Sequence, residues 1–167
     1  MTAVIVAAVA GVLGIMVGRL WDTRSESTRW RRDQKTGCYQ RLAEQFQTTY
    51  EAIRAVARAD TDADSRHALI EHTRNGVFPS WDSAVASVWL HGSLEVVMAA
   101  TLLDEAIGEL HDGALRRQIV SQQDWDRARD PARRAFECFL AAARRELDLA
   151  PVGIEFPVRP EVIDRSS

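Results

Sequence analysis

The chain has 167 residues, a net charge of −3, and 46% hydrophobic and 27% charged residues. This composition is that of one ordinary folded domain, and it excludes a disordered or fibrous chain. Four histidines, two cysteines far apart in the chain and no glycine-rich phosphate loop leave little material for a metal centre, a redox pair or a nucleotide site.

The first feature along the chain is an apolar run over residues 3–18, which contains no charged or hydrogen-bonding side chain. As a helix this run spans about 24 Å, and the flanking residues extend it to about 30 Å, the thickness of a bilayer core. The sequence therefore predicts a transmembrane anchor over residues 1–21.

Two alternatives compete with a retained anchor. A cleaved signal peptide has a basic segment before its apolar run, whereas here the basic residues follow it. A buried helix of a globular domain usually has a polar stripe, and residues 3–18 have none. We favour the anchor over both.

The charges that follow the apolar run predict its orientation. Residues 19–35 carry a net charge of +3, which leaves −6 for the remainder of the chain. Because basic residues close to a span stay on the cytoplasmic side, we expect the N-terminus outside the plasma membrane and the bulk of the chain in the cytoplasm. The side chains expected to contact anionic lipid at this boundary are Arg19, Trp21, Arg24, Arg29, Arg31 and Arg32.

Small residues lie at regular spacing within the predicted anchor. Gly14 and Gly18 are four residues apart, a spacing that lets two helix backbones approach closely in lipid. This spacing predicts a possible homodimer contact. Glycine and alanine are also common in membrane helices, so composition alone is the alternative, and we favour it over a self-association face.

The anchor helix is predicted to continue into the cytoplasm, as one helix or a slightly broken one from about residue 3 to about residue 59. Its apolar seam repeats every seven residues and ends before the acidic run at 60–64. The seam consists of Tyr39, Leu42, Phe46, Thr49, Ile53 and Val56. Gly37 is a weak interruption.

Three further helices and one additional helical stretch are predicted. The first begins at Asp64 or Ser65 and stops at Asn75-Gly76, and the second runs from about residue 81 to about residue 111. After a helical stretch at about 115–128, Asp130-Pro131 predicts the start of the last helix. The second of these has two heptad seams, formed by Trp89, Val96, Leu103 and Leu110 and by Val85, Gly92, Ala99 and Ala106.

No segment alternates apolar and polar residues as a strand does, so the predicted fold class is all-α. We expect a transmembrane helix that continues into a cytoplasmic antiparallel bundle of three long helices and one or two short ones. The expected divisions are the anchor at 1–21, the bundle at 22–150 and an extended, proline-containing tail at 151–167.

The sequence shows no catalytic, metal-binding or cofactor-binding residues. His67 and His72 are not on one helix face, and His91, Ser93 and Glu95 are too close in the chain to form a relay. The acidic residues between 104 and 112 predict a solvated face, with a loose cation site as the alternative. An acidic body with one lysine argues against nucleic acid.

The two cysteines are expected to be free thiols in a reducing cytoplasm. A redox pair between Cys38 and Cys138, or a lipid attached to Cys38, are the alternatives.

One resemblance rests on the segment Trp30-Arg31-Arg32-Asp33, on Tyr39 and Leu42, and on the stretch Val88-Trp89-Leu90-His91-Gly92-Ser93-Leu94-Glu95-Val96. This layout resembles uncharacterised small single-span membrane proteins of high-GC Gram-positive bacteria and their phages, over about half of the chain. The resemblance implies a membrane-anchored helical architecture and no activity, cofactor or catalytic residue. Gly37, just before Tyr39, departs from the pattern.

These features favour an anchored interaction module over an enzyme. We expect the bundle to self-associate or to recruit an unknown cytoplasmic partner to the lipid bilayer. The alternative is a small regulatory or defence-type membrane protein, bacterial or phage-encoded, that acts on the bilayer or on another membrane protein.

Overall fold

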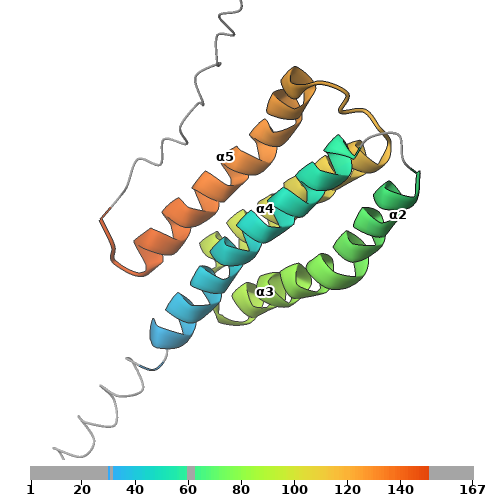
Figure 1. Cartoon of the computed structure of the whole chain (residues 1–167). Helices are drawn as coiled ribbons and strands as arrows, with labels where there is room; N and C mark the ends of the chain where they lie inside the picture. Colours follow the sequence, from blue (N-terminus) through green and yellow to red (C-terminus); the bar gives the residue numbers. More distant parts are fainter. Residues whose placement is uncertain (1–29, 31, 60–62, 151–167) are drawn as a thin grey trace, which may run out of the picture.

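The structure, a computed structural model, describes residues 30, 32–59 and 63–150 (Figure 1). Every regular element among them is helical, which confirms the predicted all-α class. The elements are the first helix at residues 32–58, α2 at Ala63–His72, the π-helical turn η1 at Thr73–Val77, α3 at Phe78–His91, α4 at Leu94–Leu115 and α5 at Gln122–Glu146.

These elements form an antiparallel bundle with four long members, because α2, η1 and α3 follow one another without a break (Figure 1). Successive members alternate in direction, so the bundle has two ends. The Gly92 end contains the beginning of the first helix, the turn between α3 and α4, and the end of α5. The Ser121 end contains the end of the first helix, the beginning of α2, and the connection between α4 and α5.

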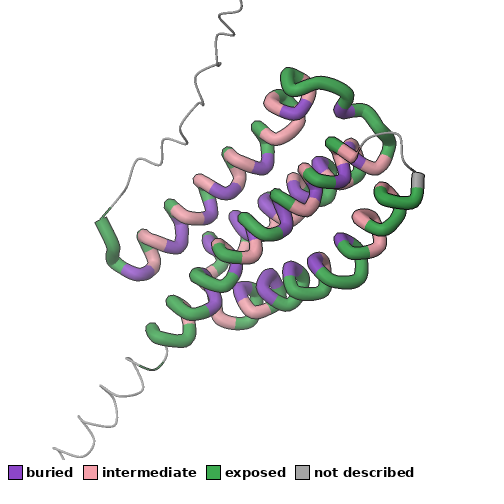
Figure 2. Tube along the Cα trace, in the orientation of Figure 1, coloured by how far each residue is buried: buried purple, intermediate pink, exposed green. Residues whose placement is uncertain are grey.

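The first helix confirms the predicted seam over the described residues. All six seam residues, from Tyr39 to Val56, are buried, and they face the interior of the bundle (Figure 2). Gly37 lies inside the helix and does not interrupt it. Its position is exposed, and a Cβ atom there would have no neighbouring atom within 4 Å. The helix thus runs from 32 to 58, and the part predicted for residues 3–29 lies outside the described residues.

Aromatic rings join the first helix to α5. Phe46 stacks on Phe136 with ring centroids 4.0 Å apart and an interplanar angle of 7°. Tyr39 meets the ring of Phe139 edge-on at 6.1 Å. These contacts bury large rings between two helices that are about 90 residues apart in the chain, and they fix the pairing of the two helices.

The predicted stop at Asn75-Gly76 is wrong. The chain passes through these residues as the π-helical turn η1 and continues directly into α3. Thr73 and Val77, at either end of η1, are both buried. Their burial keeps the turn helical where the local Asn-Gly signal favours a stop.

The single helix predicted over 81–111 is also wrong, since the chain turns at Gly92 and Ser93. Both have extended backbones, with φ/ψ of −77°/157° and −67°/164°. Trp89, assigned to a seam across this turn, is 54% exposed. Apolar residues at intervals of seven recur on both sides of this tight turn, so the heptad pattern does not reveal that the helix ends there. The pattern therefore predicts one helix where the structure has two.

The predicted start of the last helix, at Asp130-Pro131, is wrong. Residues 118–120 are not helical, and α5 begins at Gln122 and continues through Pro131. Its start is fixed by a capping box: the Ser121 hydroxyl accepts the Asp124 backbone N–H at 3.1 Å, and Asp124 accepts the Ser121 N–H at 3.1 Å. This reciprocal pair satisfies two backbone donors, and Pro131 is left inside the helix.

The predicted anchor at 1–21, its residues Gly14 and Gly18, and the tail at 151–167 lie outside the described residues. So do five of the predicted lipid contacts, which are Arg19, Trp21, Arg24, Arg29 and Arg31. Among the helices that the structure does describe, none combines the length and the apolar character that a membrane span needs.

Two adjacent leucines of α4 test the bundle core. Leu103 is fully buried, whereas Leu102 is 57% exposed. We expect Leu103→Ala to lower the free energy of unfolding by about 3 kcal/mol, because it leaves a cavity. Leu102→Ala is the matched control and should cost less than about 1 kcal/mol. Urea unfolding of the full chain, followed by circular dichroism, measures both, and equal losses would contradict this packing.

Candidate functional site

Glu146, the last residue of α5, is a polar group that contacts three residues from two other parts of the bundle. Its Oε2 accepts a hydrogen bond from the Tyr39 hydroxyl at 2.5 Å and another from the Ser93 backbone N–H at 3.2 Å. Its Oε1 pairs with the ammonium group of Lys35. One carboxylate therefore joins the first helix, α5 and the turn between α3 and α4. We call Lys35, Tyr39, Gly92, Ser93 and Glu146 the Glu146 cluster.

The cluster holds a charge that is largely withdrawn from water, since the Glu146 side chain is 13% exposed. Burial by itself raises the pKa of Glu146, but the hydrogen bonds from Lys35, Tyr39 and Ser93 outweigh it and lower the pKa to about 2. Ser93 directly precedes α4, so the carboxylate also lies near the positive end of that helix.

Tyr39 donates from the first helix to this carboxylate. Burial raises the pKa of Tyr39, and its hydrogen bond to Glu146 raises it further, because loss of the phenolic proton would place two negative charges in contact. The hydroxyl therefore stays protonated and acts as a fixed donor.

Gly92 makes room for the cluster. A Cβ atom at this position would lie 2.8 Å from the Val88 carbonyl oxygen and 3.4 Å from the Tyr39 hydroxyl. Its backbone conformation is open to any residue, so the requirement for glycine is one of space. The Val88 carbonyl is also the acceptor for the Gly92 N–H, at 2.8 Å, and it cannot easily move.

Two further contacts surround the cluster at the Gly92 end. Arg32 donates to the Leu147 carbonyl at 2.5 Å and so covers the end of α5. Arg145 pairs with Glu95 at 2.5 Å, but both side chains are more than half exposed and the pair contributes little. Arg32 is the one predicted lipid contact among the described residues, and its lipid contact stays a prediction.

A surface of a different character lies beside the cluster. Leu94, Met98 and Leu102 of α4 are 76%, 59% and 57% exposed, and their spacing of four places them on one helix face. At the neighbouring end of α3, Trp89 and Leu90 are exposed as well. We call Leu94, Met98 and Leu102 the α4 apolar face.

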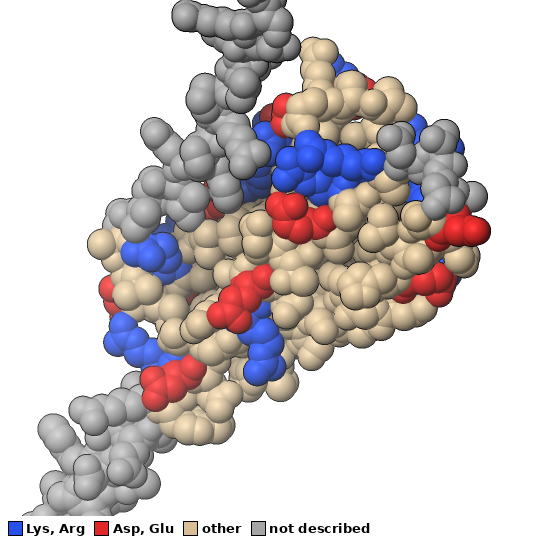
Figure 3. Space-filling model, viewed as in Figure 1, with Lys and Arg blue, Asp and Glu red and all other residues tan. Residues whose placement is uncertain are grey.

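The outer face of the first helix differs, since its exposed positions hold mostly polar and charged residues. On the side of the molecule that carries this helix, side chains of both charge signs lie interspersed (Figure 3).

Asp104 and His111, from the acidic segment between residues 104 and 112, have structural partners. Asp104 accepts the Trp81 indole N–H at 2.6 Å, and His111 packs against Phe78 with ring centroids 4.7 Å apart. Burial lowers the pKa of His111. In the described ranges no three His, Cys, Asp or Glu side chains are grouped as metal ligands.

The remaining sequence candidates are separate from one another. Cys38 is buried and Cys138 exposed, both as free thiols. Burial raises the pKa of the Cys38 thiol. Ser93 contacts Glu146 through its backbone, whereas Glu95 pairs with Arg145, so these two residues serve different contacts.

Sequence reasoning singled out Tyr39, Gly92 and Ser93 but missed Glu146. One signal was present, because a carboxylate in the last turn of a helix opposes the helix dipole unless a cation or donor pairs with it. Lys35, the single lysine of the chain, is that cation. The pair is 111 residues apart in sequence, beyond the reach of any local pattern.

Comparisons with protein-family models, with curated proteins and with solved structures find no match to this chain.

The lowered pKa of Glu146 predicts a pH-dependent stability. Ionised Glu146 stabilises the fold above its ordinary pKa of 4.5, and this contribution, up to about 3 kcal/mol, is lost as the pH falls towards 2. We expect Glu146→Gln to lower the free energy of unfolding at pH 6, with the difference from the wild type shrinking between pH 4.5 and 2. Urea unfolding across that range measures it. Glu95→Gln, at an exposed carboxylate, is the control and should change little; a gap for Glu146→Gln that is constant with pH would contradict the assignment.

The space at Gly92 supplies a second prediction. Gly92→Ala should lower the free energy of unfolding by about 1–3 kcal/mol, since the new methyl group meets a backbone carbonyl that is itself hydrogen-bonded. Gly37→Ala, in an open helical position, should instead raise it by up to about 1 kcal/mol. Thermal unfolding of the two variants compares them, and a neutral Gly92→Ala would show that the turn is not tightly packed.

Proposed function

We propose that this protein is a single-pass membrane-anchored helical module that uses the α4 apolar face to bind a second copy of itself. Residues 3–18 are its anchor, with the bundle on the cytoplasmic side. The α4 apolar face carries this proposal: Leu94, Met98 and Leu102 form a continuous exposed row on a helix whose opposite side is fully packed. Exposed apolar rows of this kind mark contacts with other proteins or with lipid.

The position of this row supports a role near the membrane. The chain enters the described bundle at residue 32, at the Gly92 end, which is also where α4 begins with Leu94. The Glu146 cluster ties the first helix to the turn before α4 through Tyr39 and Ser93. An anchor attached to the first helix would therefore hold the α4 apolar face in a defined position at the membrane side of the bundle.

A second copy is the partner that this surface fits best. The three residues of the α4 apolar face are themselves uncharged, and Glu95, the exposed acidic residue between them in sequence, is paired with Arg145 of its own chain. Two copies related by a two-fold axis would therefore meet along this row without opposing unpaired like charges. The Gly14 and Gly18 spacing in the anchor would permit the same pairing within the bilayer. A cytoplasmic partner protein is the second possibility for this face.

Oxidative cross-linking of the full chain in bacterial membranes tests the proposal. In a background with Cys38→Ala and Cys138→Ser, we expect Met98→Cys to form disulfide dimers. Thr48→Cys, at an exposed position on the polar face of the first helix, is the control and should stay monomeric. Adding Leu102→Glu should reduce dimers at Met98→Cys about tenfold, because a charge would be buried in the contact.

The same membranes test the anchor. The chain should stay with the membrane after a carbonate wash, and Val12→Arg should release it, because a charge at the centre of a span is costly. Equal cross-linking at positions 48 and 98, or dimers unaffected by Leu102→Glu, would contradict the dimer face. Release of the unaltered chain by carbonate would contradict the anchor.

A further inference from the structure

A cavity lies at the Ser121 end of the described bundle, far from the Glu146 cluster. It has a volume of about 370 Å³ and opens between the end of the first helix, α2 and the connection from α4 to α5. Val56, Ile119 and Trp125 give it an apolar wall. Pockets that bind small molecules have volumes of about 300–1,000 Å³, so its size suits a small ligand.

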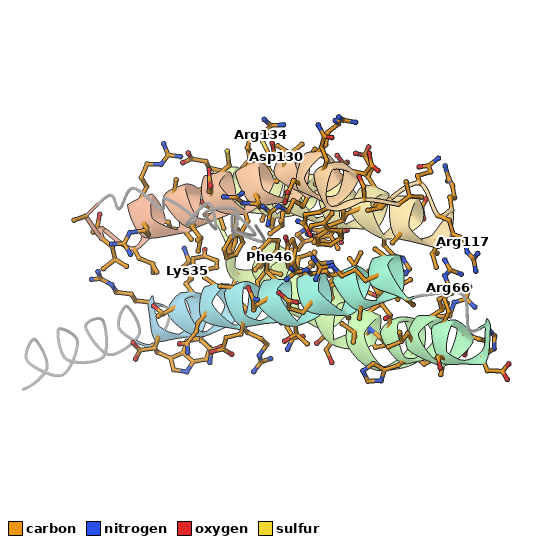
Figure 4. The ribbon with its side chains drawn as sticks, turned by 45° about the horizontal axis from the view of Figure 1, so that its top comes forward. Lys35, Phe46, Arg66, Arg117, Asp130 and Arg134 are labelled. Carbon is orange, nitrogen blue, oxygen red and sulfur yellow. The ribbon has the colours of Figure 1, made fainter. Side chains whose placement is uncertain are left out.

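Positive charge converges on this cavity from three separate elements. Arg58 comes from the first helix, Arg66 from α2 and Arg117 from the turn after α4. Figure 4 shows Arg66 and Arg117 together at this end of the bundle, with Lys35 at the other. No acidic side chain is among the described residues that line the cavity. Such a lining attracts anions.

The guanidinium groups keep hydrogen-bonding capacity. Arg58 donates through Nη2 to Gln122 at 2.5 Å, and Arg66 donates through Nη2 to the carbonyls of Ala114 and Leu115 at 3.1 and 3.0 Å. These bonds hold both side chains in place. Each guanidinium has five N–H groups, and the others have no partner among the described residues. The backbone N–H of Arg117 donates to the Ala114 carbonyl at 3.3 Å, but its guanidinium makes no hydrogen bond or ion pair within the described part of the chain.

Three further features of the cavity favour an anion. Arg117 has a φ of 55°, which is uncommon for a residue other than glycine. Backbone conformations of this kind are found most often at functional sites, where they position a side chain. Ser121 and Gln122, at the positive N-terminal end of α5, line the cavity. The Trp125 indole N–H is buried without a partner in the described bundle, although it lies in the wall.

We propose that this cavity binds a small organic anion. Arg117, together with Arg58 and Arg66, holds its phosphate or carboxylate head group, because the guanidinium fork matches both oxyanions. The apolar part of the ligand packs on Val56, Ile119 and Trp125. This site is separate from the α4 apolar face, which begins with Leu94 at the opposite end of the bundle.

Isothermal titration calorimetry of the full chain in a non-ionic detergent, at constant ionic strength, tests the site with phenyl phosphate and benzoate. Inorganic phosphate is the third probe. We expect one ligand per chain, with tighter binding of an aromatic anion than of inorganic phosphate. Whichever aromatic anion binds more tightly identifies the preferred head group.

Arg117→Gly is the decisive variant. It removes the guanidinium and suits the positive φ, so the thermal midpoint should be unchanged or higher. Binding should weaken about tenfold or more, as expected when charge-assisted hydrogen bonds are lost. Arg117→Lys keeps the charge but not the fork and should bind with intermediate affinity.

Arg134→Ala is the matched control. Arg134 is an exposed arginine of α5 that does not line the cavity (Figure 4). Removing this side chain should leave the dissociation constant within about twofold of the wild-type value, a smaller change than the loss of one hydrogen bond causes. The proposal is overturned if neither aromatic anion binds at concentrations up to about 10 mM, because a weaker affinity would correspond to a binding free energy too small for a specific site. Equal weakening by Arg117→Gly and Arg134→Ala would overturn it as well, since only the net charge would then matter.

Discussion

The buried carboxylate of Glu146 constrains the whole Gly92 end of the bundle. A charge withdrawn from water is costly unless donors surround it, and here the donors come from the first helix and from the turn before α4. The carboxylate can therefore be buried in its ionised form only when these elements and α5 are assembled. Tyr39 is needed because its hydroxyl reaches across from the first helix, and Gly92 is needed because any larger residue would displace the turn.

This arrangement divides the molecule into two ends with different surface chemistry. At the Gly92 end the polar groups Lys35, Tyr39 and Glu146 satisfy one another internally, and the exposed apolar residues of the α4 apolar face lie nearby. At the Ser121 end the charges remain directed to a cavity, through Arg58, Arg66 and Arg117. Between the two ends lies the packed core, in which Leu42, Ile53 and Leu103 are fully buried, so the two surfaces are kept apart.

Local patterns predicted the helices well and their limits poorly. The seam of the first helix is predictable because one face is buried along its whole length, so periodicity and burial agree. The errors at Asn75-Gly76, at Gly92 and at Pro131 share one cause. In each case a local signal competes with packing or capping. Buried Thr73 and Val77 flank Asn75-Gly76, and the Glu146 cluster forms at Gly92. The Ser121 capping box starts α5 well before Pro131.

The sequence by itself determined the all-α class, the buried face of the first helix and the apolar character of residues 3–18, since these depend on composition and on periods of a few residues. Only the tertiary structure decided where α3 ends and α4 begins, that Lys35 and Glu146 meet across 111 residues, and that three arginines from separate elements line one cavity. The physical reason is that these contacts are made between helices: their energy depends on the relative placement of whole elements, which no spacing along a single helix records.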